Sequence, residues 1–240
     1  MIIDIMDVNQ LLEKTKNAIR LREGGKLDLS RKLFSEIVTE AEVLSKSHDK
    51  KELDAYIYIM SEWVIQLRHE GKRYYLKALE KARNVYNFSK LNKINNPRAV
   101  RGISNTLMNL EAYEVAEDYL EEMLNLIPET DSARRGDIMT HLARCYFRTG
   151  QISLAEKELG KAIGNIDKNI GGSSALEIAV WKSHALIVKT LLLNSKGKFK
   201  EALKESQNAF KIAEKENATL RMKEATEIIN FLKSKIDSNG

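Results

Sequence analysis

The stretch from residue 136 to residue 166 constrains the fold more than any other part of the chain. It contains two amphipathic helices joined by a tight turn at Thr149–Gln151. In both helices the apolar residues recur at the i, i+3/i+4, i+7 spacing of one helix face. These apolar residues are Ile138, Leu142, Cys145 and Tyr146 in the first helix, and Ile152, Ala155, Leu159, Ala162, Ile163 and Ile166 in the second. A helical hairpin of this kind leaves one apolar flank exposed, so it needs a neighbour of the same type.

Looser copies of this unit occur along the rest of the chain. Each has a small residue in its second helix, followed four and seven positions later by further residues of the same stripe. The small residues are Ser30, Ala78, Ala116, Ala155 and Ala202, at spacings of 48, 38, 39 and 47. A glycine precedes most of these second helices, but in the third unit Glu111 takes its place. In the fifth unit one residue of the apolar stripe is polar, Ser206. The spacing predicts an array of helix pairs.

The unit resembles the tetratricopeptide repeat (TPR). The residues that carry the resemblance are Leu142, Ala143, Tyr146, Gly150, Ala155, Leu159 and Ala162. They match a pattern of a small residue and an aromatic on the first helix, a turn glycine, and two alanines on the second. The TPR unit has 34 residues, so the longer spacing here is similar to the repeats of about forty residues in kinesin light chains.

We therefore expect an all-α, right-handed solenoid of about five helix pairs forming a single domain over residues 1–240. Only two prolines interrupt the chain, which is consistent with an almost wholly helical protein. A final apolar stripe on a helix at 217–236 predicts a C-terminal capping helix. The predicted helix pairs are 7–24/27–46, 49–70/73–93, 97–110/112–127, 132–149/151–168 and 174–195/198–215.

Several predicted helices have recognisable start signals. Asp7 and Gln10 have the spacing of a capping box before the first helix. Asn96 followed by Pro97 predicts an N-cap with proline at the first helical position. Ser174 and Glu177 have the spacing of a second capping box.

Composition excludes several classes of protein. The single cysteine rules out a disulfide within the chain and fits a reducing compartment. No apolar run has the roughly 18 residues of a membrane span, and the first residues lack the basic and apolar regions of a secretory signal. We therefore expect a cytoplasmic protein with no membrane partner. The net charge of +5 favours no class of partner by itself.

The sequence shows no constellation of catalytic residues. The four histidines, at positions 48, 69, 141 and 184, fall on different predicted elements, and no HExxH or CxxC spacing is present. Cys145 lies on an apolar stripe, where a packed core thiol is expected. We predict a protein that is not an enzyme, without a metal site or cofactor.

Charge is segregated in the third and fourth units. Residues 111–131 contain eight acids and no lysine or arginine. The preceding helix, 97–110, contains Arg98 and Arg101 and no acid, and residues 132–150 contain four arginines against Asp137 alone. The first helices of TPR pairs line a concave surface, so the resemblance implies a basic interior and an acidic exterior for these two units.

Helical spacing places the candidate site residues on one stripe of each first helix. Phe147 lies beside the stripe and offers an apolar contact, while Lys182 and Lys189 are candidates for its continuation in the fifth unit. Some TPR domains bind a terminal carboxylate through lysine and asparagine on their inner helices, and Arg101 and Asn105 stand at matching places. The candidate peptide-binding residues are Arg98, Arg101, Asn105, Asn109, His141, Arg144, Phe147 and Arg148.

The pattern predicts a non-catalytic adaptor or scaffold that binds an acidic or C-terminal segment of a protein partner in a basic groove. Three alternatives remain open at this stage. The same surface could bind RNA, with Phe147 and tyrosines stacking on bases. The acidic third repeat could dock on a basic face of a second copy, giving a homo-oligomer. A sensor role similar to that of bacterial peptide-pheromone receptors is the third.

Overall fold

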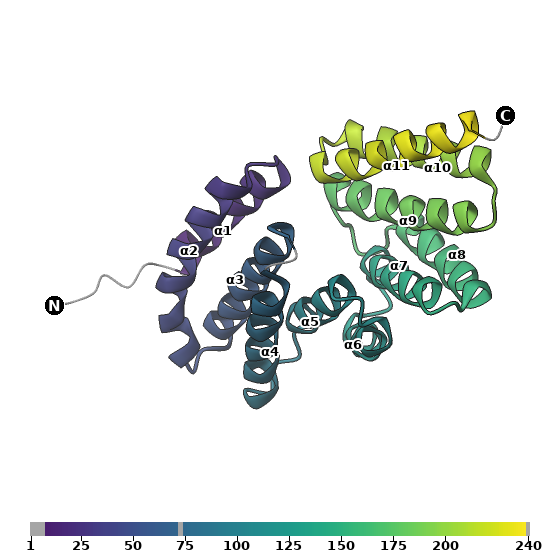
Figure 1. The fold of residues 1–240 in the computed structure, drawn as a ribbon. Coiled ribbons are helices and arrows are strands. Elements are labelled where there is room, and N and C mark those ends of the chain that lie inside the picture. Colours follow the sequence, from purple (N-terminus) through teal and green to yellow (C-terminus); the bar gives the residue numbers. More distant parts are fainter. Residues whose placement is uncertain (1–7, 72–73, 239–240) are drawn as a thin grey trace. The chain divides into compact units, whose positions relative to one another are not determined.

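The structure, a computed structural model, describes residues 8–71 and 74–238, and these residues are almost entirely helical (Figure 1). Eleven α-helices and one 3-10 turn, η1, lie within the described residues. Their bounds are α1 Val8–Glu23, α2 Leu27–Ala41, η1 Glu42–Lys46, α3 Lys50–His69, α4 Tyr75–Leu91, α5 Pro97–Asn109, α6 Tyr113–Leu126, α7 Ser132–Arg148, α8 Ile152–Lys168, α9 Ala175–Ser195, α10 Phe199–Lys215 and α11 Thr219–Asp237. The predicted all-α class is confirmed.

The observed helix ends agree with the predicted ones to within two residues, with one exception. The helix predicted over 27–46 is α-helical only to Ala41 and then tightens into η1. The Asn96 side chain accepts from the backbone N–H of Arg98, and Ser174 and Glu177 form both bonds of a capping box. Asp7, the first residue of the other expected capping box, lies outside the described residues.

The chain divides into two compact units, residues 1–119 and 120–240, with the boundary inside α6. In the first unit α1 packs on α2 and α3, and α3 packs on α4 and α5. In the second unit α7 packs on α8 and α9, and α10 packs on α9 and α11 (Figure 1). Within each unit, the first helix of a pair therefore contacts the first helix of the next pair. The single domain over 1–240 stays a prediction.

The predicted anchor residues are buried in all five repeats. Each repeat contributes three of them from its second helix, and they are Ser30, Phe34, Ile37, Ala78, Ala82, Val85, Ala116, Leu120, Met123, Ala155, Leu159, Ala162, Ala202, Ser206 and Ala209. Ser30 shows how a polar anchor is accommodated, because its hydroxyl has two acceptors for its one proton, the Ala18 carbonyl oxygen at 2.8 Å and the Gln66 amide oxygen at 2.7 Å. Cys145 is buried as well, as expected for a core thiol.

The same backbone hydrogen bond closes the α1–α2, α5–α6, α7–α8 and α9–α10 turns. In the α7–α8 turn the backbone N–H of Gln151 donates to the Tyr146 carbonyl at 2.8 Å, and Gly150 has a φ of +81°. This six-residue closure with a left-handed residue is the Schellman arrangement. The same bond closes the α5–α6 turn, where Glu111 adopts the left-handed conformation with a φ of +62°. The turn geometry is therefore kept where the glycine is missing.

Helices α7 and α8 approach each other closely at Gly136. A Cβ atom there would lie 2.6 Å from the Ala162 carbonyl oxygen and 2.7 Å from Cγ1 of Ile166. Both contacts are far shorter than van der Waals distance, so only glycine fits at this position. The hairpin recognised in the sequence is thus held by a backbone contact that the apolar pattern did not reveal.

Helix α11 closes the second unit. It packs on α10 and also contacts α9. Ala225 and Leu232 are buried, whereas Phe231 is 49% exposed. The helix predicted at 217–236 is therefore present, with most of its apolar stripe turned toward α9 and α10 and one aromatic side chain left accessible.

Replacing Gly136 by alanine should destabilise the second unit. We expect a loss of about 1–3 kcal/mol, because the new methyl group must displace backbone atoms, measured as a lower free energy of unfolding in urea. Gly160→Ala on α8 is the matched control, since a Cβ there meets nothing within 4 Å. The control should gain about 0.5–1 kcal/mol from reduced backbone entropy. Equal effects of the two substitutions would contradict the close approach.

Replacing Glu111 by glycine should stabilise the first unit. A left-handed L-residue costs about 1–2 kcal/mol, partly offset by the entropy of glycine, so we expect a net gain of about 0.5–1 kcal/mol. Gly150→Ala, at the same place of the α7–α8 turn, should have the opposite sign. Thermal unfolding followed by circular dichroism would measure both, and a destabilised Glu111→Gly variant would refute the strain argument.

Candidate functional site

Arg98, the first residue of the predicted basic stripe, is already engaged by its own unit. Its Nη1 atom donates to Oε1 of Glu62 on α3 at 3.0 Å. Its guanidinium carbon lies 4.4 Å from the ring centroid of Tyr58, within the range of a cation–π contact. The Arg98 side chain is 47% exposed, so part of it still reaches solvent. Its charge, however, is neutralised by a carboxylate that the sequence analysis did not single out.

Glu62 is shared by two arginines. Its Oε2 atom accepts from Nη2 of Arg22 on α1 at 2.8 Å, and Arg22 also donates to the Glu62 carbonyl at 3.2 Å. Arg22 and Glu62 are both buried. The chain Arg22–Glu62–Arg98 therefore connects α1, α3 and α5, one first helix from each of three successive repeats. We call it the arginine–glutamate network.

The charges of the network affect the pKa values of Arg22 and of the neighbouring Tyr58. Burial alone would lower the pKa of the Arg22 guanidinium, but the adjacent carboxylates of Glu62 and Glu23 outweigh this effect and raise the pKa. Burial raises the pKa of the Tyr58 phenol, and the charge of Glu62 adds to the rise while Arg98 opposes it. Both shifts favour the protonated forms. The network is therefore a fixed structural charge cluster at neutral pH.

The remaining candidates of α5 differ in how far they are buried. Arg101 and Asn109 are partly exposed, whereas Asn105 is only 4% exposed. The Oδ1 atom of Asn105 is buried without a hydrogen-bond partner among the described residues. Helix α5 is buried at most positions from 99 to 108. The spacing predicted one exposed polar face and one buried apolar face on α5. In the structure the polar face is partly buried as well, as Asn105 shows.

On α7, in the second unit, the candidates run from buried to exposed along the helix. His141 is buried, Arg144 and Phe147 are partly buried, and Arg148 is exposed. The Nε atom of Arg144 is buried and has no hydrogen-bond partner in the described part of the chain. Because buried donors are nearly always satisfied, this one is conspicuous.

The other basic residues near the stripe have local structural roles. Arg134 pairs with Asp131 at 3.2 Å. Arg135 donates to the carbonyls of Leu124 and Ile127, at 2.9 and 2.8 Å, and so satisfies acceptors at the C-terminal end of α6.

Lys182 and Lys189 do not support the suggested continuation of the stripe. Lys182 pairs with Asp167 on α8, and Lys189 pairs with Glu205 on α10 at 2.8 Å. Both partners lie on second helices, so these two lysines connect α9 to its neighbours.

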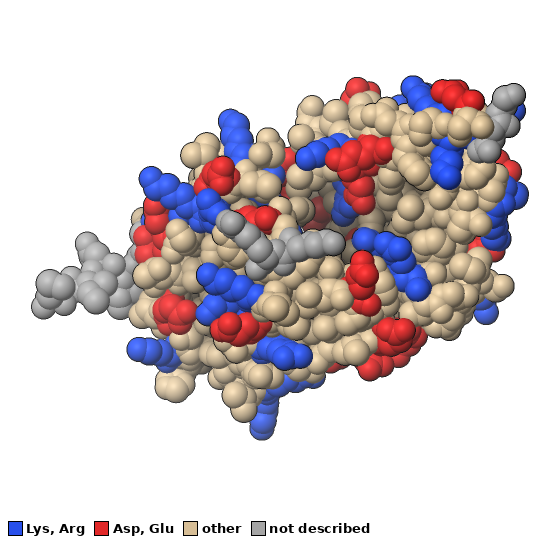
Figure 2. All heavy atoms as spheres, viewed as in Figure 1, with Lys and Arg blue, Asp and Glu red and all other residues tan. Residues whose placement is uncertain are grey.

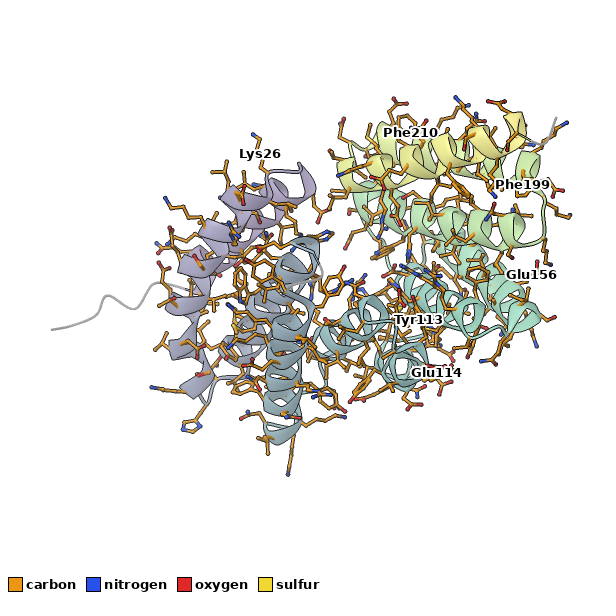
Figure 3. The ribbon with its side chains drawn as sticks, in the orientation of Figure 1. Lys26, Tyr113, Glu114, Glu156, Phe199 and Phe210 are labelled. Carbon is orange, nitrogen blue, oxygen red and sulfur yellow. The ribbon has the colours of Figure 1, made fainter. Side chains whose placement is uncertain are left out.

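The acidic segment is largely accessible. Glu111, Glu114, Asp118 and Glu121 are exposed, whereas Glu117 and Glu122 are partly buried. Figure 3 labels Glu114 beside the buried Tyr113 at the start of α6. On the face drawn in Figure 2, basic and acidic side chains are interspersed on each unit. Lys196 and Glu156, 2.6 Å apart, form one of the exposed ion pairs of the second unit.

One apolar hollow lies away from the candidate residues. It is formed by α9 and α11 and has a volume of about 200 Å³. Its lining includes Leu191, Ile228, Phe231 and Leu232, and none of the predicted site residues. No helix among the described residues is long and apolar enough to cross a bilayer.

Comparisons with known proteins identify the fold. No protein-family model and no curated protein matches the chain. Two crystal structures of nearly identical TPR-like repeats, from a Podosopora anserina protein described as a putative kinesin light chain, align with it. Each is 15% identical and covers 88% of this chain and 98% of its own, with TM-scores of 0.56 for a single-substitution variant and 0.55 for the other. A crystal structure of BtubC (BKLC) from P. vanneervenii is 17% identical and covers 88% of this chain and 91% of its own, with a TM-score of 0.57.

The chain has a TPR-like helical-repeat fold. This confirms the resemblance drawn from residues 142–162, including its similarity to the repeats of kinesin light chains. At these identities the likeness concerns the fold alone. The TPR-like fold explains why the first helices of successive repeats contact one another, as α1, α3 and α5 do in the first unit.

Removing Glu62 should destabilise the first unit strongly. Glu62→Ala leaves Arg22 buried without its main counter-charge, and breaking a buried pair in this way typically costs about 3–5 kcal/mol. Urea unfolding would measure the loss. Glu156→Ala is the control, because its pair with Lys196 is exposed and should contribute no more than about 1 kcal/mol. A Glu62→Ala variant as stable as the control would show that the network is dispensable.

Proposed function

We propose that the protein is a non-catalytic interaction module that binds an acidic or C-terminal segment of a partner protein, with Arg144 as the main anion contact. The observation that carries the proposal is the buried Nε of Arg144, which donates to no acceptor among the described residues. The TPR-like fold supports the general role, because repeats of this type expose extended surfaces that commonly bind other proteins. The names of the similar structures mention no ligand that could be transferred.

A carboxylate is the chemical group that best fits this donor. The guanidinium group presents its N–H donors in a planar fork, and a carboxylate can accept two of them in parallel. A buried donor left unsatisfied costs about 1–3 kcal/mol, so a carboxylate that accepts from the Arg144 guanidinium once this side chain turns outward recovers this energy as well as forming a charged bond. Arg98, Arg134 and Arg135 have acceptors within the chain already. Arg144 is therefore the better candidate for an external anion.

The charged contact alone cannot give useful affinity. A hydrogen bond to a charged group contributes about 1.5–3 kcal/mol, whereas a micromolar complex requires about 8 kcal/mol. The ligand must also bury apolar surface. Phe147 is partly exposed and lies three residues after Arg144, so the two side chains share one side of α7. An acidic residue flanked by an apolar one is therefore the ligand motif that we propose.

We also propose that three residues of α5, in the first unit, contact a peptide. Arg101 and Asn109 are accessible on α5, and Asn105 provides a buried acceptor for a backbone N–H. Within the first unit, these residues suit a peptide backbone and a carboxylate. His141 and Arg148 complete the proposed peptide-contacting set on α7, with His141 reaching the ligand only through its small exposed edge.

The test is a binding series with a matched charge reversal. Proteins captured from a cell extract would be identified by mass spectrometry, and labelled peptides from them would be titrated by fluorescence anisotropy. Arg144→Glu should weaken binding by roughly 10- to 150-fold, corresponding to one charge-assisted bond. Lys157→Glu, the same charge change at an exposed position on α8, should have little effect. Binding should also weaken as salt increases.

The result that would overturn the proposal is equal binding by Arg144→Glu and Lys157→Glu with unchanged helical spectra. Co-purifying nucleic acid with a steep salt dependence would favour RNA binding instead. Dimers seen by light scattering at tens of micromolar, lost in Arg144→Glu, would replace the peptide with a second copy of the chain.

A further inference from the structure

Three potential metal ligands converge where α7 packs on α9. Asp137 and His141 lie one turn apart on α7, and His184 approaches them from α9. One ligand atom from each residue lies within 4.8 Å of the other two. His141 Nε2 is 3.7 Å from Oδ1 of Asp137, and the centroids of the His141 and His184 rings are 4.6 Å apart.

All three side chains are buried. Asp137 and His184 are each 2% exposed, and His141 is 8% exposed. Ile138, Leu142, Ala185 and Val188, on the same two helices, are also buried. All three potential ligands belong to the second unit.

We propose that Asp137, His141 and His184 bind a divalent transition-metal ion, with Zn²⁺ as the expected occupant. Two imidazole nitrogens and one carboxylate oxygen form a donor set that suits Zn²⁺, whereas Mg²⁺ and Ca²⁺ prefer oxygen ligands alone. Three protein ligands leave one position of a tetrahedral site for water. The negative charge of Asp137 offsets part of the charge of the ion.

The geometry requires only a small adjustment. A tetrahedral ion about 2.0–2.1 Å from each ligand places its ligands about 3.3–3.4 Å apart. The His141–Asp137 distance is already close to this value, and the separations within the cluster need to shorten by at most about 1.5 Å to reach that geometry. The ion would then join α7 and α9 and hold the fourth and fifth repeats together.

The spacing in the sequence explains why the cluster was not predicted. Asp137 and His141 are an ordinary i, i+4 pair, and His184 is 43 positions further along the chain. No short motif contains all three. The histidines fall on different predicted helices, so no metal site was expected from the sequence. Their meeting depends on the contact between α7 and α9.

The test uses the full-length protein treated with a chelator and then dialysed. Zn²⁺ is titrated by calorimetry in competition with a chromogenic chelator, and we expect one equivalent to bind and to raise the unfolding midpoint. His184→Ala and the near-isosteric Asp137→Asn should each weaken binding by more than about 100-fold, because losing a second-shell partner alone costs roughly 10- to 100-fold. His48→Ala, which removes an exposed histidine outside the cluster, should bind as the unaltered protein does.

Co²⁺ provides a second readout that does not depend on a variant's stability. The Co²⁺-loaded protein should show the visible bands of a four- or five-coordinate site and no thiolate charge-transfer band, because the cluster contains no cysteine. A thiolate band would overturn the ligand assignment. The proposal is also refuted if no stoichiometric Zn²⁺ binding is seen, or if Asp137→Asn and His48→Ala bind equally well. In either of those cases the three residues are a packed polar cluster.

Discussion

The close approach of two helices within each repeat is the constraint on which the rest of the structure depends. It requires a small residue in the second helix, such as Ala155, and in one hairpin a glycine in the first, Gly136. The left-handed turn residue then brings the second helix back against the first. Once the hairpin is closed, its remaining apolar flank must be covered by the next hairpin. The order of the helices along the chain therefore also sets which of them touch.

This constraint is why so much of the fold could be predicted. Helical periodicity, cap residues and turn glycines are local signals, and they gave nearly every helix end to within two residues. The prediction also holds for the α5–α6 turn, which has no glycine. There the N–H of Ala112 donates to the Leu107 carbonyl around Glu111, as the equivalent bonds do around the turn glycines. The 3-10 ending of the second helix was not predicted, since no residue in 42–46 distinguishes a 3-10 turn from a continuing helix.

The candidate site was less predictable, because the spacing of charged residues does not show what lies opposite them. Arg98 and Arg144 are equivalent in a helical-stripe argument, yet Arg98 is bonded to Glu62 and Arg144 has a buried Nε without an acceptor among the described residues. Lys182 and Lys189 also fitted the stripe, and both pair with second helices. Asn105 fitted it and is buried. The side of a helix can be read from a sequence, whereas the partner on the neighbouring helix cannot.

The polar contacts that were not predicted from the sequence all join helices that are neighbours in the repeat array. Arg22 bonds Glu62 across 40 positions, and Glu62 bonds Arg98 across 36. Ser30 bonds Gln66 across 36 positions. Each of these bonds joins two helices that pack together: α1 with α3, α3 with α5, and α2 with α3. His141 and His184, 43 positions apart, meet for the same reason. In a TPR-like array, complementary polar residues one repeat apart are therefore the pairs to examine first, even where no motif joins them.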